Sequence, residues 1–140
     1  MTVILVAVHD STAAFEAADA AIALAARLGA RLRAVAVVDP EPVTGGPHPT
    51  TALVHLEDGA DAALRHVVRV ADEASVPATT TRRHGRIARE ILAEARECSA
   101  DLVVMAVVDR PGHAIPRVGS HTLRVLEHAE VPVVVVPPRI

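Results

Sequence analysis

The most constraining feature of the sequence is an apolar run that leads into a loop rich in glycine and proline. The run spans Leu102–Val108 and has no polar position. Such a run is typical of a strand in a parallel sheet that is covered on both faces. After the loop, Ser120 stands where a helix N-cap is expected, ahead of Leu123 and Leu126 at helical spacing. A strand, a glycine-bearing loop and a helix start often hold an anion, because the helix start presents free N–H groups.

The rest of the sequence alternates between apolar runs typical of strands and amphipathic runs typical of helices. We therefore predict a single α/β domain over residues 1–140, with a five-stranded, mainly parallel open sheet and helices on both faces. The predicted strands are 3–8, 32–38, 78–83, 102–108 and 133–136, and the predicted helices are 12–28, 58–75, 86–97 and a last one that follows Ser120.

The segment between the second strand and residue 57 shows neither a strand period nor a helical period. It contains four prolines and two glycines. We predict a long excursion without regular structure here, of the kind that often acts as a lid over a site.

The composition excludes several function classes. Phe15 is the only aromatic residue and the formal net charge is −3, so the protein lacks the stacking platforms and the basic surface of a nucleic-acid binder. Lysine is absent, which excludes Schiff-base catalysis and a phosphate-loop lysine. Cys98 is the only cysteine, so no internal disulfide or cysteine metal cluster can form. The eight histidines show no paired-ligand spacing, and we predict no metal site.

The sequence also lacks the signals of a membrane protein. No apolar stretch reaches membrane-spanning length, and Met1 leads directly into the first strand without a basic leader. We expect a cytoplasmic protein that contacts no membrane.

Four segments carry a resemblance to a known family. They are ILVAVHDST at the start, LAARLGARLRAVAVVDP in the first helix and second strand, AREILAEARECSADLVVMA before the loop, and GSHTLRVLEHAEVPVVVVP at the end. Together they resemble the universal stress protein family over essentially the full chain. The resemblance implies the strand order 3-2-1-4-5, with a ligand site beyond the carboxyl ends of the first and fourth strands, where the order reverses.

The resemblance further implies an adenine-nucleotide site with a degenerate motif. Members that bind ATP carry G-x2-G-x9-G-[S/T] after the fourth strand, and the three glycine positions fall here on Ala106, Asp109 and Gly119, followed by Ser120. Asp109 brings a carboxylate toward a polyanion, which can cost on the order of a few kcal/mol. The candidate binding residues are His9, Asp10, Ser11, Val38, Asp39, Ala106, Asp109, Arg110, Gly112, Gly119 and Ser120.

His9 is the other departure from the family pattern, because it occupies the position of a carboxylate that contacts the nucleotide. An imidazole can offer an N–H to a phosphate or to an adenine edge, or become cationic in mild acid. A histidine that only caps the turn is an equally good interpretation.

Three functions are compatible with these observations. The first is a non-enzymatic, dimeric stress-response module with a degenerate nucleotide pocket and no certain cofactor. The second is a member that binds ATP or AMP, and the third is a weak nucleotide hydrolase. We favour the first over the second because two of the three motif glycines are replaced, one of them by an acid, and over the third because no G-x-S-x-G elbow is present. Gly119 and Ser120 are expected to keep a small-anion site even without a nucleotide.

The last strand predicts a homodimer. In the implied order Val133–Val136 lies at an open sheet edge, where a valine-rich strand is an association hazard unless a partner covers it. The third strand, at the other edge, ends in Arg82 and Arg83, which is typical of an edge protected by charge. We therefore expect two copies to pair through Val133–Val136.

Overall fold

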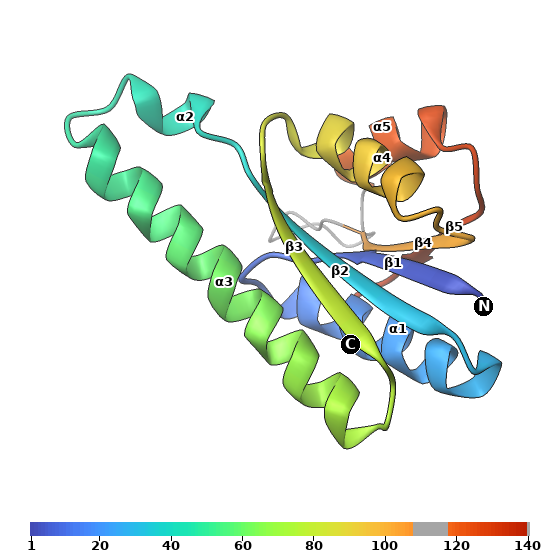
Figure 1. Cartoon of the computed structure of the whole chain (residues 1–140). Coiled ribbons are helices and arrows are strands. Elements are labelled where there is room, and N and C mark those ends of the chain that lie inside the picture. The colour runs from blue at the N-terminus through green and yellow to red at the C-terminus, as the bar shows by residue number, and fades with distance from the viewer. Residues whose placement is uncertain (108–117, 140) are drawn as a thin grey trace.

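Five parallel strands in the order β3-β2-β1-β4-β5 form the sheet, as seen in a computed structural model that describes residues 1–107 and 118–139 (Figure 1). This order and the α/β class confirm the predicted fold. The elements are β1 (Val3–Ala7), α1 (Thr12–Leu28), β2 (Arg31–Val38), α2 (Glu41–Thr44), α3 (Pro49–Glu73), β3 (Ala78–His84), α4 (Ile87–Glu97), β4 (Leu102–Ala106), α5 (Ser120–His128) and β5 (Val133–Val136).

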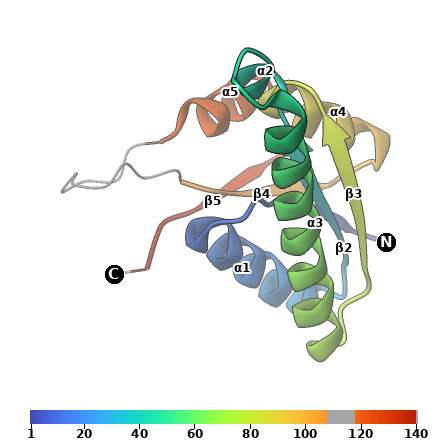
Figure 2. The same ribbon diagram turned by 90° about the vertical axis from the view of Figure 1, so that its left-hand side faces the viewer.

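The helices cover both faces of the sheet, with α1 and α3 on one face and α4 and α5 on the other (Figures 1 and 2). Side chains of a strand alternate between its two faces, so each apolar run is divided between two cores. In β1, Ile4 and Val6 pack into the α1 and α3 core, whereas Leu5 packs into the α4 and α5 core. This double burial explains why β1 and β4 are apolar at every position.

Helix α1 matches the predicted bounds because both of its ends carry strong signals. Ser11 accepts a hydrogen bond on Oγ from the backbone N–H of Ala14 at 3.1 Å, which satisfies one free donor of the first turn. Gly29 ends the helix in the left-handed conformation, with φ of 63°. Alanines at the buried positions allow α1 to lie close to the sheet.

The prediction of an irregular excursion up to residue 57 is wrong. Helix α2 follows the carboxyl end of β2, and α3 begins at Pro49 and runs for 25 residues (Figure 1). The prolines misled the interpretation because Pro49 occupies the first turn of α3, where proline is favourable and its missing N–H has no partner to lose. Leu53 packs against the core, so the apolar face of α3 extends beyond the predicted start.

The predicted N-cap of the last helix is also wrong by one residue. Gly119 is the N-cap of α5, and Ser120 is its first helical residue without a side-chain capping bond. The first turn is closed by the N–H of Leu123, which donates to the carbonyl of Gly119 at 2.9 Å.

A buried carboxylate ties α4 to the sheet. Glu94 on α4 has only 3% of its surface exposed, which is unusual for a charged residue. Its two carboxylate oxygens accept from Arg33 on β2 and from Arg83 on β3, each at 3.1 Å. Arg83 also contacts Glu90 at 2.9 Å and Glu97 at 2.7 Å. Arg83 is therefore neutralised by carboxylates of α4.

We predict that Glu94→Gln lowers the free energy of unfolding by about 2 kcal/mol. The substitution keeps the side-chain volume but leaves two arginines facing a neutral group, and the cost is moderated because both arginines still reach solvent. Urea denaturation measures the change. Glu97→Gln is the matched control, since Glu97 is 64% exposed, and its loss should be clearly smaller. Equal losses for the two variants would contradict this account of Glu94.

Candidate functional site

A cavity of about 620 Å³ opens at the carboxyl ends of β1, β2 and β4. This is the position where the strand order reverses, and the volume suits a small-molecule ligand. Apolar side chains from the strands, α3 and α4 make up most of its walls. The polar lining residues are His9, Asp10, Asp39, His55, His121 and Thr122. Within the described parts of the chain, no arginine lines this cavity.

The end of β1 brings two of the three predicted residues into the cavity. His9 and Asp10 line it, and the tight turn behind them is closed by the N–H of Ser11, which donates to the carbonyl of His9 at 2.8 Å. Ser11 lies next to the cavity but is not part of its wall, because its hydroxyl caps α1. Asp10 is also close to α3, where a Cβ added at Gly59 would lie 3.9 Å from the Asp10 Cβ.

The end of β2 contributes another part of the cavity wall. Val38 is 3% exposed and lines the cavity together with Asp39. The Asp39 carboxylate accepts a hydrogen bond on Oδ1 from the N–H of Glu41 at 3.0 Å, which fixes the first turn of α2. The predicted pair at this strand end is therefore in place.

The end of β4 is joined to the start of α5 by one buried hydrogen bond. Thr122 is 1% exposed and donates from Oγ1 to the carbonyl of Ala106 at 3.0 Å. Both residues line the cavity. Ser120 lines an adjoining groove between α4 and α5 instead, together with Arg86 and Arg124, and this groove shares Asp39 and His121 with the cavity.

Three of the predicted binding residues cannot be placed. Asp109, Arg110 and Gly112 fall within 108–117, outside the residues that the structure describes. Their role stays a prediction from the sequence.

His9 is the titratable group whose charge state the cavity affects most clearly. The walls of the cavity partly desolvate its ring, and this lowers the pKa of His9, although His9 as a whole residue is exposed. Asp10 raises the pKa of His9, and His121 lowers it. Desolvation dominates, so His9 is neutral at pH 7.

Several residues of the site were missed in the sequence. Thr122 and His121 follow the predicted motif within one helical turn, and a threonine on the same face as Val125 was a readable sign of a buried hydroxyl. His55 could not be found, because it lies in the segment that was predicted to be irregular.

The comparisons with known proteins agree with this arrangement. The sequence model described as the universal stress protein family matches residues 1–137. This chain belongs to the universal stress protein family. A universal stress protein of Methanocaldococcus jannaschii is 33% identical over 136 residues, which cover 95% of this chain and 80% of that protein.

Solved structures of the family share the fold. A family protein from Burkholderia pseudomallei is 28% identical, with a TM-score of 0.80 over 98% of this chain and 96% of its own. A universal stress protein from Archaeoglobus fulgidus, solved in complex with dAMP, is 20% identical, with a TM-score of 0.73 over 96% of this chain and 97% of its own.

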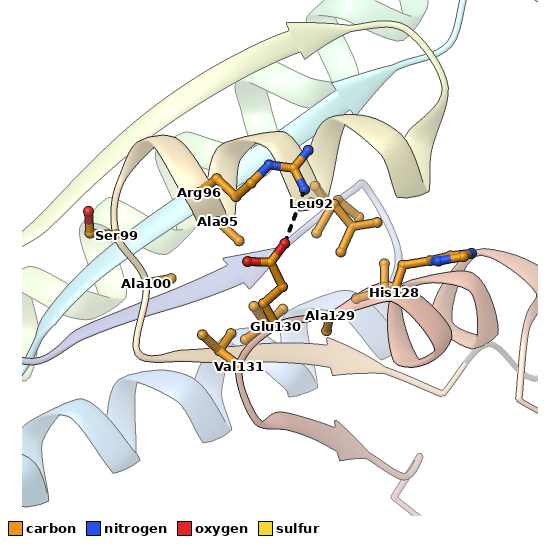
Figure 3. Close-up of a pocket in the computed structure, with 12 residues that line it drawn as sticks. Leu92, Ala95, Arg96, Ser99, Ala100, His128, Ala129, Glu130 and Val131 are labelled. Carbon is orange, nitrogen blue, oxygen red and sulfur yellow. Dashed lines mark ion pairs between the residues drawn. The ribbon is translucent and has the colours of Figure 1, made fainter.

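A second, smaller cavity of about 260 Å³ lies between α4 and α5 in this universal stress protein (Figure 3). Arg96 and Glu130 point toward one another across it, with 3.9 Å between their charged atoms. Both side chains are well exposed, at 60% and 76%, so the ion pair contributes little to stability.

In residues 1–107 and 118–139, no three His, Cys, Asp or Glu side chains gather in a way that could hold a metal ion. Over the same residues, no helix is both long enough and apolar enough to cross a membrane.

Proposed function

We propose that this universal stress protein is a non-enzymatic, homodimeric binding module whose cavity takes an adenine nucleoside or mononucleotide and discriminates against ATP. The observation that carries the proposal is the cavity of about 620 Å³ at the ends of β1, β2 and β4. The dAMP complex of the Archaeoglobus fulgidus relative supports it, because that protein shares the fold and takes a mononucleotide.

The walls of the cavity favour a base and a ribose. Val38 and Met105 are 3% and 5% exposed, and they line it from opposite sides of β1 in the sheet order. Aliphatic side chains of this kind can pack against a purine ring. Asp39 and Thr122 are the polar groups beside them, and their oxygen atoms can hydrogen-bond the ribose or the base edge.

The charges of the cavity disfavour a triphosphate. Asp10 and Asp39 line it, and the histidine beside them is neutral at pH 7. Each added phosphate brings further negative charge toward these carboxylates, and Asp109 adds another acid in the motif. A nucleoside or a mononucleotide avoids most of this repulsion.

Two side chains that could act as nucleophiles are in inactive settings, which supports a binding role. The hydroxyl of Ser11 caps α1. Burial raises the pKa of the Cys98 thiol, and the nearby Glu94 raises it further, so the thiol stays protonated at pH 7. Cys98 also lies outside the cavity, at the carboxyl end of α4.

We predict that AMP binds more tightly than ATP, and that ATP binding improves about tenfold in a variant with Asp109→Asn and Ala106→Gly. The double change removes the carboxylate and the methyl group from the two altered motif positions. Isothermal titration calorimetry measures the affinities. Asp72→Asn removes a charge on α3 far along the chain from the motif and should leave ATP binding unchanged. Submicromolar binding of ATP to the unaltered protein would contradict the proposal.

The dimer proposal rests on the open edge of the sheet. Strand β5 pairs with β4 on one side only, and Val134 is 39% exposed. Helix α5, which precedes β5 in the chain, also exposes Leu123 and Leu126, at 47% and 42%. The other edge is different, because Arg82 on β3 forms ion pairs with Glu57 and Asp61 on α3. Two copies that pair antiparallel through β5 would cover the unprotected edge.

We predict that Val134→Asp converts the dimer to a monomer or causes aggregation. Two aspartates near a two-fold axis repel one another and resist desolvation. Size-exclusion chromatography with light scattering measures the molar mass. Thr79→Asp is the matched control, since Thr79 is an exposed residue of the other edge strand, β3, and this variant should stay dimeric. A wild-type protein that is monomeric at micromolar concentration would show that the edge is not an interface.

A further inference from the structure

Three histidines from three different elements line the proposed nucleotide cavity. His9 follows β1, His55 lies on α3, and His121 lies in the first turn of α5. They are the only lining side chains, among the described residues, that can carry positive charge. Imidazoles gain that charge in mild acid, so the potential inside the cavity depends on pH.

The groups that face His9 determine how easily it takes up a proton. Asp10, its neighbour in the turn, attracts a proton to the ring, and a charge on His121 across the cavity repels one. Asp39 at the end of β2 and His55 on α3 complete the titratable lining. Arg86 and Arg124 line the adjoining groove, which shares Asp39 and His121 with the cavity. Desolvation of the imidazole ring by the cavity walls keeps His9 neutral at pH 7.

We propose that the cavity binds an anionic adenine mononucleotide together with a proton that His9 carries. This inference rests on the proposed function and adds its regulation. A phosphate beside His9 supplies the negative charge that offsets desolvation and the repulsion from His121. Linkage is reciprocal, so a ligand that favours the protonated ring is itself bound more tightly at lower pH.

The consequence is a site whose selectivity changes with pH. In mild alkali the neutral imidazoles and the two carboxylates favour an uncharged nucleoside. In mild acid the protonated ring favours the mononucleotide. Because adenosine carries no phosphate, its binding should not depend on the charge of His9.

The test is calorimetry with AMP and with adenosine, from about pH 8 to about pH 5.5. It compares the wild-type protein with the His9→Asn variant, and the His48→Asn variant is the matched control. His48 is an exposed residue at the start of α3 that does not line the cavity. The phosphate of AMP itself titrates near pH 6, so the effect of His9 is taken as the ratio of wild-type to variant affinity at each pH.

We expect the ratio of wild-type to His9→Asn affinity for AMP to rise about tenfold from the alkaline to the acid end, as for a pKa raised by one unit on binding. Titrations in two buffers of different ionisation enthalpy should show that the wild-type protein takes up more protons on binding AMP than the His9→Asn variant does. The His48→Asn variant should match the wild-type protein at every pH. For adenosine, the ratio of wild-type to His9→Asn affinity should not change with pH. Thermal unfolding of each variant checks that it is folded at every pH.

The outcomes separate the inference from the proposed function. If AMP and adenosine bind but the AMP ratio stays flat, or if His48→Asn changes it as much as His9→Asn does, the proton linkage is wrong and the proposed function stands. If neither ligand binds wild type at millimolar concentration at any pH, the proposed function fails and the linkage fails with it.

Discussion

The structure depends on β1, the middle strand of the sheet, which is buried on both faces. Strand β1 pairs with β2 on one side and with β4 on the other, and its central side chains are completely buried. Helix α1, which follows β1, and helix α5, which follows β4, lie on opposite faces of the sheet, and the cavity opens where the strand order reverses. The hydrogen bond from Thr122 to the carbonyl of Ala106 then fixes the start of α5 at the rim of this cavity.

The sequence predicted those parts of the fold that local physical chemistry determines. Apolar runs buried on both faces identified β1 and β4, and Ser11 and Gly29 identified both ends of α1. The start of α3 was missed because proline in a first helical turn was taken as a sign of irregular structure. Glu94 was missed because its burial depends on Arg83 from the preceding strand and on Arg33 from β2, which is distant in the sequence.

The candidate site could be predicted in part for the same reason. The family pattern pointed to His9, Val38, Asp39 and Ala106, which the fold brings to one cavity. It could not indicate His55, whose position depends on a long helix that the sequence interpretation did not contain. The electrostatic character of the site emerges only when α3, α5 and the strand ends are brought together, because its titratable lining, among the described residues, consists of two carboxylates and three imidazoles. Our proposal that the site discriminates against polyphosphates rests on that charge pattern.

The most direct test of a mononucleotide site at the reversal of strand order is a crystal structure of the protein with AMP. The account predicts a purine between Val38 and Met105, with the phosphate within hydrogen-bonding distance of His9. Two results would contradict it: AMP bound in the groove that Ser120, Arg86 and Arg124 line, or no AMP at the ends of β1 and β4 in crystals grown with saturating AMP.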